Sequence, residues 1–103
     1  MNEKALALRI ATLRNKKGVS ARDMSLSMGQ NAGYINNIES GKSMPSLSGI
    51  FYICEYLNIT PKELFDEGLE NPEKLNHIIE DMKHLSDKQL DTIYSLVKEL
   101  RNK

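Results

Sequence analysis

Residues 20–41 read SARDMSLSMGQNAGYINNIESG, and this stretch decides the fold of the chain. Apolar or small side chains recur in it at helical spacing in two groups, on either side of Gly29: Met24, Ser25, Met28, Ile35 and Ile38. That spacing places each group on one face of a helix. Glycine permits a sharp turn because it tolerates a positive φ. The stretch therefore predicts two short helices that cross steeply over a shared core.

Two helices joined in this way are typical of the helix-turn-helix motif, whose second helix lies in the major groove of DNA. We expect Ser20 to cap the first of the two helices. The second is expected over about residues 32–40, with Asn31 as its N-cap and Gly41 after its end. We expect the rest of the chain to support this second helix.

Capping signals delimit three further helices before residue 67. A helix over about residues 3–16 ends at Gly18, a residue suited to a left-handed C-cap. The run TPKE at 60–63 combines an N-cap threonine, a proline at the first helical position and a capping-box glutamate. Between them, Ser46 begins a helix with a broad apolar face, formed by Leu47, Ile50, Phe51, Ile53, Cys54 and Leu57. We therefore expect a DNA-binding domain over residues 1–66.

The C-terminal third has a different pattern. Residues 67–71 are acidic and contain Gly68, which predicts a short linker. Residues 72–103 carry two amphipathic helices, separated by the capping sequence SDKQ at 86–89. Their apolar stripes are Leu75, Ile78, Ile79, Met82 and Leu85 in one helix, and Leu90, Ile93, Leu96 or Tyr94, Val97 and Leu100 in the other. Since burial of one leucine contributes about 1.5–3 kcal/mol, these stripes must pack on each other, on the first domain or on a second chain.

No strand signal is visible, so the predicted fold class is all-α: five helices followed by a C-terminal helical hairpin. A hairpin of this kind is suited to dimerisation or to the docking of a partner protein. The rival interpretation is that the two helices only cover the first domain.

The composition excludes several classes of protein. With 103 residues and 40% apolar residues, the chain suits one small domain with an appendage. The single cysteine can form no internal disulfide, and no cofactor or metal-binding pattern is visible. No apolar run approaches the roughly 20 residues of a membrane span, and residues 1–10 lack a signal-peptide core, so we expect a cytoplasmic protein. No catalytic constellation stands out, and we expect no enzyme.

The charge is distributed unevenly although the formal net charge is zero. Residues 1–50 contain 7 lysines and arginines against 3 acidic residues, a balance of +4. Residues 51–103 contain 7 basic against 11 acidic residues, a balance of −4. A basic half that carries the motif favours a polyanionic partner on one side of the molecule.

A longer string of residues extends the motif in both directions. It consists of Arg14, Gly18-Val19-Ser20, Met24-Ser25, Gly29, Ile35, Ile38-Glu39-Ser40-Gly41-Lys42, Pro45, Ile53, Leu57, Ile59 and Leu64-Phe65. In order and spacing, residues 4–65 thus resemble the phage-repressor-like helix-turn-helix family, which includes Cro, the lambda-type repressors and the Xre regulators. The resemblance implies a five-helix lambda-repressor-like domain, a dimeric repressor bound to a double-stranded DNA operator, and an ion pair between Arg14 and Glu39.

The same resemblance suggests which residues contact DNA. Base contacts are expected from the start and outer face of the second helix, namely from Asn31, Ala32, Gly33, Asn36 and Asn37. An asparagine amide can pair with adenine, and the alanine methyl can contact the thymine methyl. Contacts with the DNA backbone are expected from Arg22, Tyr34, Lys42 and Ser43.

The sequence departs from the family pattern at two positions. Many relatives have glutamine at the position of Ala21, where it supports the base contacts. Ser25 replaces the usual alanine at the helix crossing, and we expect its hydroxyl to bond to its own helix. The alternative function is a protein-interaction module or antitoxin with weak or vestigial DNA binding. Ala32, Gly33 and the neutral total charge favour it, whereas the basic half with the motif and the intact Gly41-Lys42 disfavour it.

Overall fold

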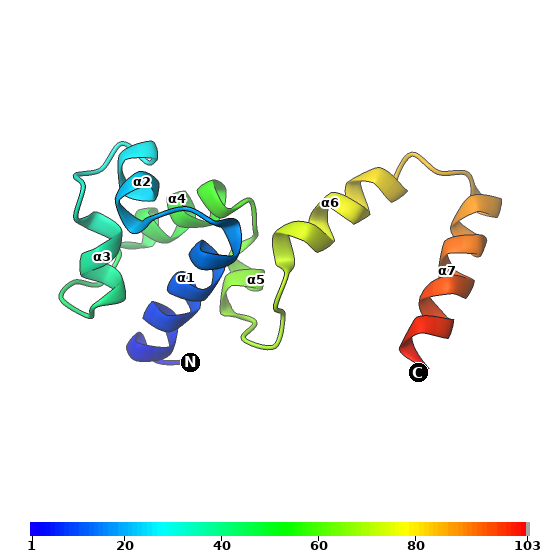
Figure 1. Cartoon of the computed structure of the whole chain (residues 1–103), viewed down its shortest axis with the longest axis horizontal. Coiled ribbons are helices and arrows are strands. Elements are labelled where there is room, and N and C mark those ends of the chain that lie inside the picture. Colours follow the sequence, from blue (N-terminus) through cyan, green and yellow to red (C-terminus); the bar gives the residue numbers. More distant parts are fainter. Residues whose placement is uncertain (103) are drawn as a thin grey trace. The chain divides into compact units, whose positions relative to one another are not determined.

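The computed structural model describes residues 1–102, and all regular elements among them are α-helices (Figure 1). They are α1 (Glu3–Lys17), α2 (Ala21–Ser27), α3 (Tyr34–Glu39), α4 (Leu47–Leu57), α5 (Pro61–Phe65), α6 (Pro72–Met82) and α7 (Asp87–Arg101). The all-α fold class is thus confirmed. The chain divides into two compact units, Met1–Glu73 and a second that begins at Lys74.

The first unit is built around one aliphatic core. α1 packs against α3, α4 and α5, while α2 packs against α3 and α4 against α5. The core is formed by Leu6, Ile10, Leu13, Met24, Ile35, Ile38, Ile50, Ile53, Cys54, Leu57, Ile59 and Leu64. Because α3 contributes two of these side chains, its orientation is tied to the packing of the whole unit.

Outside α3, the structure confirms the predicted capping residues. Gly18 has φ 79° and follows the last residue of α1. Ser20 and Ser46 each accept a backbone N–H three residues later, at the starts of α2 and α4. Complete capping boxes begin α5 and α7, with Thr60 and Ser86 as the N-caps.

The start of α3 differs from the prediction. The helix begins at Tyr34 rather than near residue 32, and its N-cap is Gly33, which has no side chain to satisfy the first N–H groups. The side chain of Asn31 instead accepts a hydrogen bond from the N–H of Gly33 at 3.1 Å. Asn31 therefore closes the turn before the helix, because a short amide side chain can bond to the backbone two residues on.

The apolar face of α4 is only partly buried. Ile50, Ile53, Cys54 and Leu57 lie in the core, as their spacing predicts. Leu47 and Phe51 are 72% and 53% exposed. These two residues are one helical turn apart, so they form an apolar edge on the outside of the first unit.

In the second unit, α6 and α7 leave their apolar side chains largely open to solvent. Eight of these side chains are between 38% and 62% exposed: Leu75, Ile78, Ile79, Leu90, Tyr94, Leu96, Val97 and Leu100. No residue of α7 is buried. Within one chain, therefore, the two helices do not bury each other's apolar stripes.

Candidate DNA-binding surface

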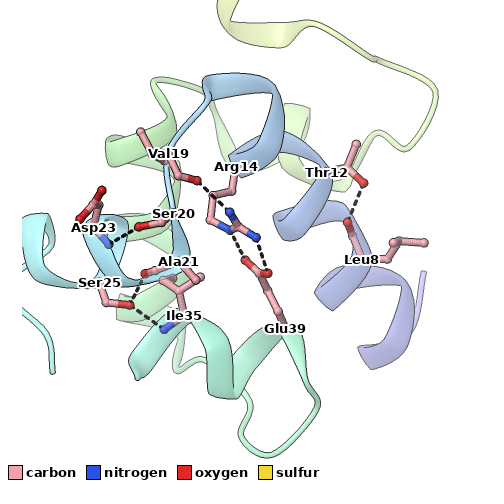
Figure 2. A network of polar contacts seen from close by, with 10 residues as sticks. All are labelled: Leu8, Thr12, Arg14, Val19, Ser20, Ala21, Asp23, Ser25, Ile35 and Glu39. Carbon is pink, nitrogen blue, oxygen red and sulfur yellow. Dashed lines mark hydrogen bonds and ion pairs between the residues drawn. The ribbon is translucent and has the colours of Figure 1, made fainter. Parts of the chain in front are cut away.

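Ser25 joins the two helices of the motif. Its side chain is fully buried. The Ser25 hydroxyl donates to the carbonyl of Ala21 at 2.7 Å, and this bond confirms the expectation that it bonds to its own helix (Figure 2). The same oxygen accepts a hydrogen bond from the backbone N–H of Ile35, 2.9 Å away in α3. Since Gly33 cannot cap α3, the hydroxyl of a neighbouring helix satisfies one of its otherwise unpaired donors.

Arg14 and Glu39 connect α1 with the C-terminal end of α3. The guanidinium Nε and Nη2 donate to the two carboxylate oxygens of Glu39 at 2.7 and 3.0 Å, and Nη1 donates to the carbonyl of Val19 at 2.8 Å (Figure 2). The side chains are 14% and 13% exposed. The hydrogen bonds that Arg14 donates to Glu39 raise the pKa of Arg14. Burial lowers this pKa, and the negative charge of Glu39 raises it further. A two-pronged bond of this kind fixes direction as well as distance.

These contacts hold α3 so that one face points away from the core. Ile35 and Ile38 are buried, whereas Asn36 and Ser40 are exposed and Asn37 is half-buried. At 3.6 residues per turn, Asn36, Asn37 and Ser40 lie on the side opposite the two isoleucines. We call Gly33, Asn36, Asn37 and Ser40 the outer face of α3.

Gly33 lies at the start of the outer face. A methyl group at this position would lie 3.7 Å from Oδ1 of Asn31 and 3.8 Å from Nδ2 of Asn37. The three residues are therefore neighbours. Asn31 is exposed in the turn before α3, and Ala32 beside it is half-buried. The five residues predicted to contact bases thus lie together, at the N-terminal end of α3 and along its outer face.

Tyr34, which is predicted to contact the DNA backbone, is less exposed than the other residues of that set. Its ring is partly buried against the core. Its hydroxyl lies against Gly49 in the first turn of α4, where a methyl group on Gly49 would be only 2.6 Å away. Tyr34 therefore connects α3 with α4, and its contact with the DNA backbone stays a prediction.

The other three residues predicted to contact phosphates are exposed. Arg22 lies in the first turn of α2. Lys42 and Ser43 lie in the loop after α3, where both of their backbone N–H groups donate to the carbonyl of Asn37, at 2.9 and 3.2 Å. The loop is thus held to α3, which leaves the Lys42 and Ser43 side chains on the surface.

Sequence reasoning missed the buried arginine of the first unit. Arg9 is 6% exposed, and its guanidinium donates to the carbonyls of Leu64 at 2.9 Å and Glu63 at 2.7 Å. It therefore satisfies carbonyls in the last turn of α5. The only signal in the sequence was its position beside Ile10, on the apolar side of the first helix.

Two absences in the described part of the chain concern metal binding and membrane insertion. Among residues 1–102, no group of three histidine, cysteine, aspartate or glutamate side chains could hold a metal ion. None of the helices in this part of the chain has the length and apolar character needed to cross a membrane.

Comparison with known families gives one match. A family model described as a helix-turn-helix domain matches residues 8–70, a span that contains α2 to α5 and most of α1. Neither a curated protein nor a solved structure matches the chain significantly.

Proposed function

The chain belongs to the helix-turn-helix domain family, and from this we propose that it is a transcriptional regulator that binds operator DNA through α3. We infer further that it is a dimeric repressor of the phage-repressor-like type, as the string from Arg14 to Phe65 suggests. No enzymatic step is part of this function.

The observation that carries the proposal is the way in which α3 is held. Ser25 bonds to its N-terminal turn and Arg14 to its last residue, and neither contact uses a side chain of the outer face. A helix fixed at both ends, with polar side chains free, is suited to enter the major groove without first being ordered.

The residues divide into two roles. Asn31, Ala32, Gly33, Asn36 and Asn37 would face base edges, where hydrogen bonds and methyl contacts distinguish sequences. Contacts with the DNA backbone would come from Arg22, Tyr34, Lys42 and Ser43, which gives affinity without sequence preference. Both sets lie on α2, α3 and the loops that flank α3.

The C-terminal helices support the proposal of a homodimer. Eight large apolar side chains that are 38–62% exposed form more apolar surface than the scattered single residues of ordinary monomers. A second copy presents the same stripes, so the two pairs of helices can bury each other about a two-fold axis. Two-fold pairing sets two recognition helices roughly 34 Å apart, which is one turn of DNA.

An electrophoretic mobility shift with the DNA upstream of the protein's own gene, at two salt concentrations and with unrelated duplex as competitor, tests the function. The proposal predicts a complex that resists the unrelated competitor and weakens as salt rises. Failure to shift any duplex at low salt would contradict it and would favour the protein-interaction module.

A further inference from the structure

The outer face of α3 carries amides and small groups but no charged side chain. Between residues 30 and 41 the sequence QNAGYINNIESG contains neither arginine nor lysine, and Glu39 is its only charged residue. Both carboxylate oxygens of Glu39 accept hydrogen bonds from Arg14. The face therefore lacks the two groups that best identify a G·C pair in the major groove, a cation for guanine O6 and N7 and a free carboxylate for cytosine N4.

The asparagines differ in how far they are available to a base. Asn36 is exposed, and its side-chain amide forms no hydrogen bond with any other described residue. The Oδ1 atom of Asn31, in contrast, already accepts the N–H of Gly33 at 3.1 Å. A bidentate contact needs a free acceptor and a free donor on one amide. Asn36 offers both and is exposed, whereas Asn37 is half-buried.

We propose that Asn36 pairs with adenine, so that each operator half-site contains an A·T pair that the protein distinguishes through this side chain. In this contact Nδ2 donates to adenine N7 and Oδ1 accepts from N6. Gly33, on the same face, has no side chain to hold the helix away from the base edges. The proposal rests on the DNA-binding function proposed above and adds the class of sequence that is bound.

Selection of bound duplexes from random DNA separates the two proposals. The wild-type protein, Asn36→Ala and the control Asn15→Ala are compared. Asn15 is an exposed asparagine of α1 outside the motif, and both substitutions place alanine on a helix surface.

We expect the wild type and the control to enrich half-sites with a fixed A·T pair, and Asn36→Ala to lose the preference at that position alone. Two results would overturn the inference and leave the function intact. One is enrichment of half-sites in which only G·C pairs are fixed, and the other is an A·T preference at that position that survives in Asn36→Ala. Absence of any enriched sequence would instead contradict the function.

An atomic substitution in the DNA tests the contact itself. Replacing the selected adenine by 7-deazaadenine removes the N7 acceptor and keeps the base pair. We expect this change to weaken binding of the wild-type protein by about 5- to 100-fold, the range of a bidentate contact. The same change should leave the affinity of Asn36→Ala unaltered, because its side chain cannot donate to N7. Equal losses in both proteins would show that another residue makes the contact and would overturn the assignment.

Discussion

The Ser25 hydroxyl accepts the N–H of Ile35 at 2.9 Å and thereby caps a helix to which Ser25 does not belong. This bond couples α2 to the start of α3 at the point where Gly33 supplies no cap of its own. A serine in place of the alanine usual in the related family thus has a structural role at the helix crossing. It fixes the helix whose outer face we propose to contact DNA.

Replacing Ser25 by alanine should destabilise the first unit. The substitution leaves the N–H of Ile35 without its partner in a buried site, and an unpaired buried donor costs about 1–3 kcal/mol. Urea denaturation followed by circular dichroism measures the loss, with Ser27→Ala as the control because Ser27 is exposed on the same helix. Equal stability of the two variants would show that the hydrogen bond contributes nothing.

Gly49 should not tolerate alanine, although alanine normally favours a helix by about 1 kcal/mol over glycine. A methyl group at this position would lie 2.6 Å from the hydroxyl oxygen of Tyr34. We expect Gly49→Ala to destabilise the protein by about 1–2 kcal/mol, as overpacking does. In a Tyr34→Phe background, which lacks that oxygen, the loss should shrink or reverse. Thermal unfolding of the four proteins gives the coupling, and additive effects would contradict the contact.

Stability should fall in alkaline solution because of Cys54. Burial raises the pKa of its thiol from 9.0 to about 11, with a smaller contribution from the charge of Glu63. The folded state then holds the thiol proton more tightly than the unfolded state. Stability from this source is present below pH 9 and is lost as the pH rises to about 11, by at most about 3 kcal/mol. The unfolding free energies of the wild type and of Cys54→Ala, measured between pH 9 and 11, should approach each other as the pH rises. A difference that stays constant over this range would contradict the raised pKa of Cys54.

Lys42→Ala should weaken binding to every DNA sequence alike. A phosphate contact carries no sequence information, and its loss should reduce the slope of log affinity against log salt by about one unit. Fluorescence anisotropy at several salt concentrations measures both effects. Lys62→Ala removes the same charge from an exposed position on α5 and serves as the control. A loss confined to one operator sequence would contradict the role of Lys42.

Removal of residues 74–103 should yield a folded monomer. The cut is placed after Glu73 because Pro72 is fully buried and Glu73 accepts a hydrogen bond from Lys17 at 2.8 Å within the first unit. Light scattering should report a dimer for the full chain and a monomer for the shortened one. Operator affinity should fall by about 100-fold or more with the loss of two-site binding. A dimer that persists after the deletion would refute the C-terminal interface.

Local signals made much of the fold predictable. Ser46, Thr60 and Ser86 mark helix starts because a short hydroxyl side chain accepts a nearby N–H, an interaction that needs no tertiary information. The same rule misplaced the start of α3. It predicts Asn31 as the N-cap, whereas the helix begins at Tyr34 and the N–H of Ile35 in its first turn donates to Ser25 of a neighbouring helix.

Features that depend on residues far apart in the chain could not be predicted from the sequence. Arg9 bonds to carbonyls 54 and 55 residues away, and no local pattern marks such a pairing. Nothing near Tyr34 in the sequence shows that its hydroxyl lies against Gly49. The exposure of Leu47 and Phe51 could not be predicted either, because periodicity defines the apolar face of a helix but not how much of that face other elements cover.

The most direct test of α3 as the DNA-contacting element is a nuclear magnetic resonance titration of the nitrogen-15-labelled full chain with a bound duplex. Backbone amide shifts on addition of DNA should concentrate on residues 30–43 and the start of α2, with Asn36 and Asn37 among the largest. Shifts confined to α6 and α7, with residues 30–43 unchanged at saturation, would contradict the account.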